Sequence, residues 1–282
     1  MSHIPQRIVS LQPSITSTID RLGLLDRVVA CTKYCIDVCP SLAQPGSQQI
    51  IVADSWTAQS SQILDAAPDL VIASVPYQLD AVAEILKAGI AFLGLAPHSL
   101  ADIYRDISMI AGVLGAAQEG RRLIEEMESE VDYVQKRAKP ALAAGAVRPR
   151  VYCEEWGKPL IHSQGWVAEL VTIVGGDFIG VPGAHADAAS ILAEDPDVII
   201  AAWCGAGDRV PLEKIITARG WSNCKAAIDQ KVFCINDEFL NTPGPTLVRG
   251  LHALAAAIHP EIFPGAKGLR RISQETSMGM FS

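Results

Sequence analysis

The feature that most constrains the fold is a long helical stretch, residues 99–139, which has strand-like segments on both sides and almost none inside it. Its apolar side chains recur every three or four residues, which places them on one face of a helix. These are Ile103, Ile107, Ile110, Leu114, Ile124, Met127, Val131 and Val134. Gly115 interrupts the pattern, so the spacing predicts two helices, over 100–114 and 117–138. The second would be about 30 Å long at about 1.5 Å per residue, enough to join two lobes.

Short apolar runs alternate with helical patterns on both sides of this stretch. The expected strands cover 7–11, 28–31, 70–74, 91–95, 150–154, 198–203 and 232–236. Such alternation favours a mostly parallel sheet with helices on both faces, and these sheets bind ligands at the carboxyl ends of their strands. We therefore expect an α/β protein of two Rossmann-like lobes joined by one long helix. The expected parts are an N-terminal lobe over 1–115, the joining helix over 116–140 and a C-terminal lobe over 148–282.

Composition narrows the class of protein and its partners. A chain of 282 residues with 49% hydrophobic and 19% charged residues can form two cores. The net charge of −8 argues against nucleic acid or an anionic membrane as a partner. No apolar run approaches the roughly 20 residues that a membrane helix needs, so we expect no membrane insertion.

The start of the chain and its cysteines suggest a compartment. The opening MSHIPQRIVSL lacks the basic and apolar regions of a signal peptide. The seven cysteines show no spacing typical of a disulfide scaffold. We therefore expect a cytoplasmic protein, or a periplasmic or cell-surface one if an export signal has been trimmed.

Two segments of the N-terminal lobe are candidates for ligand contact. Pro13 and Ser14 leave the first strand and enter a helix whose free N–H groups suit an anionic or carbonyl group. The alternative is that Ser14 only caps the helix. In the next loop, Tyr34 and Cys35 could each supply one contact to a ligand.

The same loop contains three cysteines spaced by four, Cys31, Cys35 and Cys39. On a helix this spacing would align three thiols, which suit zinc or an iron–sulfur centre. The usual CxxC pairs are missing, however, and Pro40 favours a loop. A single contact from this segment to a ligand is therefore the preferred interpretation.

Tryptophans and ionisable side chains supply the remaining candidates. Four tryptophans lie at predicted strand ends, loops or helix starts, where rigid aromatics suit the wall of a pocket or close the rim of their own lobe; they are Trp56, Trp156, Trp166 and Trp203. Glu154 and Glu155 follow a strand, and His162 and His185 lie in loops. These could bind a metal or act in acid–base chemistry, or the histidines could simply be solvated.

The motifs G-x-S-x-G, H-E-x-x-H, G-x-x-x-x-G-K-[ST] and G-x-G-x-x-G are all absent, which weakens an enzymatic interpretation.

An ordered set of motifs covers nearly the whole chain. It comprises RIVSLQPSITSTIDRLGLLDRVVACTKYC, ILDAAPDLVI, VYCEEWGKPL, GWVAELVTIVGGD, DPDVII and PGPTLVRGLHALAAAIHP. This set resembles the substrate-binding proteins of ABC importers for vitamin B12 and iron chelates, in which one rigid helix joins the two lobes. The resemblance implies a non-enzymatic receptor without a catalytic cofactor. Such a receptor holds one small metallo-ligand, cobalamin or another metal chelate, in the cleft between its lobes.

The resemblance also assigns residues by position. Pro13, Ser14, Tyr34 and Trp56 match the cleft of the N-terminal lobe in B12-binding members. Trp156, Trp166, Trp203, Asn241 and Gly244 fall on the facing loops, and Cys35 and Glu155 are further candidates for ligand contact. An ABC permease is the partner that the family implies, but Ser61 stands near the place where exported relatives carry a docking glutamate.

Two alternatives remain open from the residues. The first is a direct metal-ion receptor or sensor that uses some combination of Cys35, Glu155, His162, His185 and Cys204. The second is an enzyme acting on a metallo-cofactor, which would need a group with a perturbed pKa at the ligand site.

Overall fold

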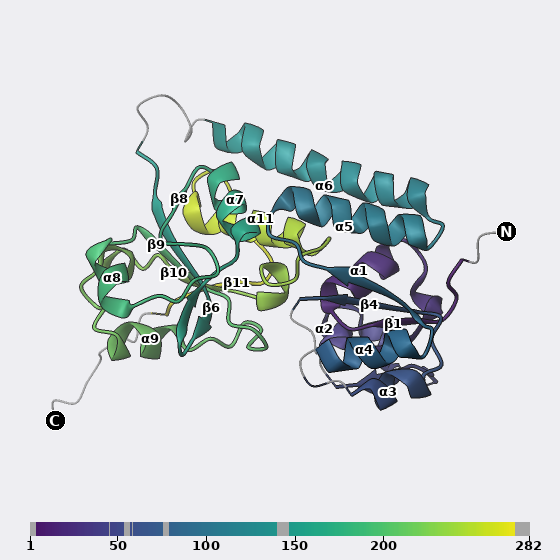
Figure 1. Cartoon of the computed structure of the whole chain (residues 1–282). Helices are drawn as coiled ribbons and strands as arrows, with labels where there is room; N and C mark the ends of the chain where they lie inside the picture. Colours follow the sequence, from purple (N-terminus) through teal and green to yellow (C-terminus); the bar gives the residue numbers. More distant parts are fainter. Residues whose placement is uncertain are drawn as a thin grey trace. The chain divides into compact units, whose positions relative to one another are not determined.

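The chain forms two compact units in the computed structural model, which describes residues 4–44, 46–53, 57, 59–75, 79–139 and 147–273 (Figure 1). Unit 1 contains residues 1–133 and 242–248, and unit 2 contains residues 134–241 and 249–282. Each unit is an α/β structure with its own sheet, and one long helix runs from unit 1 into unit 2. The predicted fold class is therefore confirmed. Within the described residues, no helix has the length and apolar character needed to cross a membrane.

Unit 1 is built around a parallel five-stranded sheet in the order β3-β2-β1-β4-β5. Its strands are β1 (Ile8–Ser10), β2 (Val28–Thr32), β3 (Ile50–Val52), β4 (Leu70–Ser74) and β5 (Ala91–Leu95). The helices between them are α1 (Pro13–Arg21), α2 (Cys35–Val38), α3 (Ser60–Asp65) and α4 (Leu79–Lys87). All residues of β1 and β4 are buried because helices cover both faces of these central strands.

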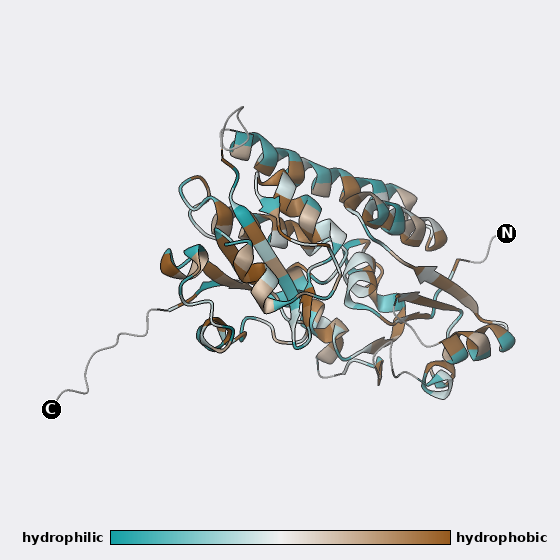
Figure 2. Cartoon of the chain, turned by 60° about the vertical axis from the view of Figure 1, so that its left-hand side comes forward, coloured by the Kyte–Doolittle hydropathy of each residue, from teal (hydrophilic) through white to brown (hydrophobic). Residues whose placement is uncertain are grey.

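The long helical stretch is split in two, as predicted. α5 (Leu100–Val113) begins with a capping box between Ser99 and Asp102. α6 (Ala117–Ala138) follows after a short turn. Figure 2 shows hydrophobic and hydrophilic residues alternating along α6, as expected for a helix with one buried face.

Unit 2 contains a mixed sheet in the order β11-β10-β9-β6-β7, with β8 also paired to β6. The strands are β6 (Arg150–Gly157), β7 (Leu160–His162), β8 (Asp177–Phe178), β9 (Val198–Ala201), β10 (Val232–Ile235) and β11 (Leu269–Arg271). Only β7 and β11 run antiparallel to their neighbours among these strands. The helices are α7 (Gly165–Ile173), α8 (Ala188–Ala193), α9 (Leu212–Ala218), α10 (Lys225–Ile228) and α11 (Leu247–Ile258). The carboxyl ends of β6, β9 and β10 therefore meet at one edge.

The two units anchor a central strand in the same way. In unit 1, the Asp69 carboxylate accepts a hydrogen bond from the Arg7 N–H, while the Asp69 N–H donates to the Arg7 carbonyl. In unit 2, Asp197 and Arg150 form the same reciprocal pair. The residue two positions before each aspartate has a left-handed φ, of 45° and 42°. The sequences of these two segments are also alike, A-P-D-L-V-I-A at 67–73 and D-P-D-V-I-I-A at 195–201, and they correspond to one repeated turn.

Candidate functional site

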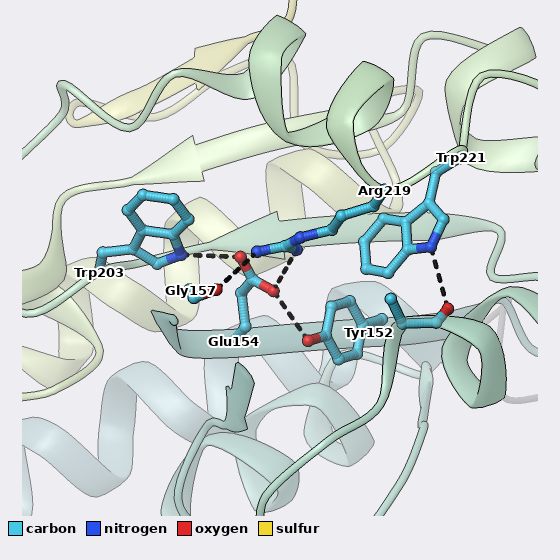
Figure 3. A network of polar contacts seen from close by, with 7 residues as sticks. Tyr152, Glu154, Gly157, Trp203, Arg219 and Trp221 are labelled. Carbon is cyan, nitrogen blue, oxygen red and sulfur yellow. Dashed lines mark hydrogen bonds and ion pairs between the residues drawn. The ribbon is translucent and has the colours of Figure 1, made fainter. Parts of the chain in front are cut away.

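A buried carboxylate lies near the carboxyl end of β6 in unit 2 (Figure 3). Glu154 is fully buried and accepts three hydrogen bonds. Trp203 donates its indole N–H to Oε1 at 2.7 Å, while the Tyr152 hydroxyl and Arg219 Nη1 both donate to Oε2 at 2.8 Å. Tyr152 reaches Glu154 because residues two apart on a strand lie on the same face. The ion pair with Arg219 and the two neutral donors compensate for the water that burial removes from the carboxylate.

The rest of the network fixes the groups that hold Glu154. Arg219 also donates from Nη2 to the Gly157 carbonyl at 3.3 Å, and its guanidinium carbon lies 4.9 Å from the centre of the Trp221 ring. The Trp221 indole donates to the Ala188 carbonyl at 3.0 Å. Burial, together with the neighbouring Glu154 charge, raises the pKa of Tyr152, so its hydroxyl remains a hydrogen-bond donor.

Trp203 is a partly exposed aromatic member of this network. It lies two residues after the end of β9, and its ring packs against the backbone of Gly157. A Cβ placed on Gly157 would lie only 2.1 Å from the ring atom Cζ2, so this close approach requires glycine. The indole is therefore fixed through its N–H and by packing against the hairpin that joins β6 and β7.

A second group of polar side chains lies at the same strand ends. Glu155 is the next residue along β6, where the pairing with β7 is irregular, and it accepts a hydrogen bond from Gln164 at 2.7 Å. Burial raises the pKa of Glu155, and the Gln164 hydrogen bond only partly opposes this. The Cys204 N–H donates to the Glu155 carbonyl at 3.1 Å. Asn241 donates from Nδ2 to the Ala202 carbonyl at 2.6 Å and to Cys204 Sγ at 3.3 Å. Three predicted residues, Glu155, Cys204 and Asn241, are thus brought together.

The Cys204 thiol is part of this group but is not a reactive thiolate. Removal of water from around the sulfur, with the neighbouring carboxylates of Glu155 and Asp237, raises the pKa of Cys204 to about 12. The thiol is therefore neutral at neutral pH. The residue is nevertheless exposed at the surface.

The predicted tryptophans differ in what they can offer a ligand. Trp156 is 42% exposed and its indole N–H donates to the Lys158 carbonyl at 2.9 Å. Trp166 is buried in α7 and donates to the Leu240 carbonyl at 2.8 Å, so its main contribution is to packing. Trp56 lies outside the described residues.

The candidates of unit 1 gather around the start of α1. Pro13 is the first residue of this helix and Ser14 is buried. Gly244 belongs to the segment 242–248 and approaches Ser14 so closely that a Cβ on it would lie 3.1 Å from the Ser14 carbonyl oxygen. Tyr34 is 38% exposed, with the Lys33 ammonium 4.8 Å from its ring centre.

The expected loop contains a short helix, α2, which includes Cys35, whereas Cys31 lies in β2 and Cys39 follows the helix; the expectation of a loop was therefore wrong for Cys35–Val38. Cys31, Cys35 and Cys39 are all buried. Burial alone would raise the pKa of Cys35, but hydrogen bonds to its sulfur, from Cys31 among others, outweigh it and lower the pKa to about 7. The Thr32 hydroxyl lies 3.3 Å from this sulfur. Cys35 has no exposed surface, so its thiol is part of the buried core and offers no contact at the surface.

The metal candidates of the described residues do not form one metal-binding cluster. His162 is buried with its ring 5.5 Å from that of Tyr152, and burial lowers its pKa. His185 is exposed in a loop. Among the described residues, no group of three or more histidine, cysteine, aspartate or glutamate side chains could hold a metal ion. Ser61 is exposed in the first turn of α3.

Sequence reasoning missed Tyr152 and Arg219, which donate to Glu154 together with Trp203, and it also missed the neighbouring Trp221. Tyr152 was read only as part of an apolar strand, and Arg219 lies 65 residues from the glutamate that it contacts. The only available signal was Glu154 itself, a charged residue two positions after a buried tyrosine. A buried carboxylate requires a partner, but the sequence does not say which arginine provides it.

Comparisons with known proteins agree with this architecture. The family described as "Periplasmic binding protein" matches residues 8–238. The uncharacterized ABC transporter substrate-binding lipoprotein YvrC of Bacillus subtilis is 26% identical over 274 residues, covering 92% of this chain and 82% of that protein. The cobalamin-binding protein of Halobacterium salinarum strain R1 is 24% identical over 275 residues, covering 90% of this chain and 70% of that protein.

A solved structure has the same fold at lower identity. The periplasmic heme binding protein from Pseudomonas aeruginosa matches with a TM-score of 0.83 at 19% identity, covering 97% of this chain and all of that one. One relative is a lipoprotein, and the Pseudomonas aeruginosa protein is periplasmic. The expectation of a cytoplasmic protein therefore gains no support from these two proteins.

Proposed function

This chain belongs to the periplasmic binding protein family, and we propose that it binds a corrinoid or a similar metal chelate as the substrate-binding component of an ABC importer. The cobalamin-binding protein among its relatives supports this class of ligand, and the ABC transporter substrate-binding lipoprotein supports the role in an importer. Within each unit, the proposal concerns only the edge at which the carboxyl ends of the strands lie.

The orientation of Trp203 is the observation that carries the proposal. Its indole is partly exposed at the carboxyl ends of parallel strands, where α/β sheets bind ligands, and it is fixed by a hydrogen bond to a buried carboxylate. A fixed aromatic ring offers apolar contact area without losing side-chain entropy on binding. This suits a large, flat macrocycle better than a hydrated metal ion.

The polar groups beside Trp203 favour a chelate with a neutral rim. Glu155 and Asn241 can exchange hydrogen bonds with amide groups, which are the peripheral groups of a corrinoid. The peripheral carboxylates of haem would instead meet Glu155 and the nearby Asp237, and like charges held close together disfavour binding. We therefore propose that the protein prefers a corrinoid to haem.

Titration of the purified protein tests this proposal. Cyanocobalamin, haemin and a ferric siderophore are added separately, and binding is followed by the visible absorbance of each chelate and by calorimetry. We expect saturable binding of cyanocobalamin with higher affinity than haemin. Absence of binding by all three chelates would refute the proposed function.

Substitution of Trp203 gives the matching prediction for the site. Trp203→Ala should weaken chelate binding by about 1–3 kcal/mol, the range for loss of a buried aromatic contact. The control is Ile228→Ala, which removes an exposed apolar side chain of the same unit and should leave affinity unchanged. Equal affinities for the wild type and Trp203→Ala would remove Trp203 from the ligand site.

A further inference from the structure

We infer that Arg219, acting through Glu154, holds the Trp203 indole in the orientation that contacts the ligand; this inference rests on the proposed function. Arg219 lies just after the end of α9, is nearly buried and forms its ion pair with a carboxylate that has no exposed surface. It is a positioning residue, because its guanidinium contacts Glu154, Gly157 and Trp221.

The two carboxylate oxygens of Glu154 accept hydrogen bonds from different donors, which supports the inference. Oε1 of Glu154 accepts the Trp203 N–H, while Oε2 accepts from both Arg219 and Tyr152 (Figure 3). The charge that strengthens the indole hydrogen bond is therefore stabilised from the opposite side of the carboxylate. If Arg219 is replaced by a neutral residue, the buried carboxylate keeps only neutral donors, and it becomes favourable for Glu154 to turn toward water.

Arg219 also contacts Gly157, the second residue that holds the Trp203 ring in place. It donates to the Gly157 carbonyl, and Gly157 is the residue against which the Trp203 ring packs. The same guanidinium thus fixes both the acceptor of the indole N–H and the backbone under the ring. Loss of Arg219 should release Trp203 without removing any atom from the ring itself.

The ligand-free protein provides the first measurement. Incorporation of 5-fluorotryptophan gives one ¹⁹F resonance for each tryptophan, and Trp203→Phe identifies the resonance of Trp203. We expect Arg219→Gln to shift or broaden the Trp203 resonance, and Arg219→Lys to restore it in part because a lysine can keep the charge beside Glu154. The control is Leu254→Ala, a buried substitution in α11 that lowers stability without touching the network.

The second measurement is a double-mutant cycle for chelate binding. If Arg219 acts through Trp203, Arg219→Gln should weaken binding on the order of tenfold in the wild type and have little further effect in Trp203→Ala. Additive effects of the two substitutions, or an unchanged Trp203 resonance and unchanged affinity in Arg219→Gln, would overturn the inference while leaving the proposed function intact. Failure of the wild type to bind any chelate would overturn the proposed function, and this inference with it.

Discussion

At the scale of single residues, Glu155 carries a charge that the fold disfavours. Burial raises its pKa above the ordinary value of 4.5, so the folded state holds a proton that the unfolded state would release. The stability associated with this proton is fully present below pH 4.5 and is lost as the pH rises through the raised pKa. Glu155 therefore lowers the stability of the folded protein at neutral pH.

Glu155→Gln should remove this penalty while keeping an oxygen that accepts the Gln164 hydrogen bond. We expect the variant to unfold at a higher temperature than the wild type at pH 7.5 and at a similar temperature near pH 4, because the wild-type side chain is protonated there. Thermal unfolding followed by circular dichroism at both pH values measures the difference. Glu128→Gln on an exposed position of α6 serves as the control, and a Glu155→Gln effect that is the same at both pH values would contradict the argument.

The sequence located several residues at strand ends but not their roles in the structure. It placed Trp203 at the end of a strand, because the end of a strand is visible where an apolar run stops. It could not distinguish Trp203 from Trp166, whose indole donates to a carbonyl 74 residues away and is buried. Such long-range hydrogen bonds depend on how the elements pack, which no local pattern encodes.

At the scale of elements, the prediction succeeded where a segment is long or fully buried. The helices α5 and α6 begin and end within one residue of the predicted bounds, since their apolar stripes span many turns. Strands β4 and β5 also match their predicted bounds. The strands that were missed, β3, β7, β8 and β11, are no more than three residues long and lie at the ends of the strand order or off it. Segments this short contain too few residues to show a period.

The contact between α5 and α6 depends on a small residue. Gly120 of α6 is buried against α5, and a Cβ on it would lie 2.4 Å from the Cβ of Ala111. Gly112 of α5 is exposed, and a Cβ there would meet no atom within 4 Å. The same substitution should therefore have opposite effects on the free energy of unfolding at these two positions.

Gly120→Ala should destabilise the protein by about 1–3 kcal/mol because the helices must move apart. Gly112→Ala should stabilise it by up to about 1 kcal/mol through the higher helix propensity of alanine. Denaturant unfolding of the wild type and the two variants gives both values. The close packing of α5 on α6 would be disproved if Gly120→Ala proved as stable as Gly112→Ala.

At the scale of the whole molecule, unit 1 is not continuous in sequence. After α6 the chain belongs to unit 2, yet residues 242–248 return to unit 1 before the rest of α11. The repeated aspartate turns show that each unit has its own strand anchor, in agreement with the two-lobed fold of the family. Unit 1 is nevertheless complete only when residues far along the chain have been placed.

Gly244 tests this dependence. It lies against the Ser14 backbone at the start of α1, and a Cβ added to it would be only 3.1 Å from the Ser14 carbonyl oxygen, which leaves no room for a branched side chain. Gly244→Val should therefore displace the segment 242–248 and reduce the protection of α1 amides from hydrogen exchange. The β9 and β10 amides at the centre of the unit 2 sheet should keep theirs, because the altered contact lies within unit 1. Loss of protection in unit 2 strands with none in α1 would show that residues 242–248 support the second unit instead.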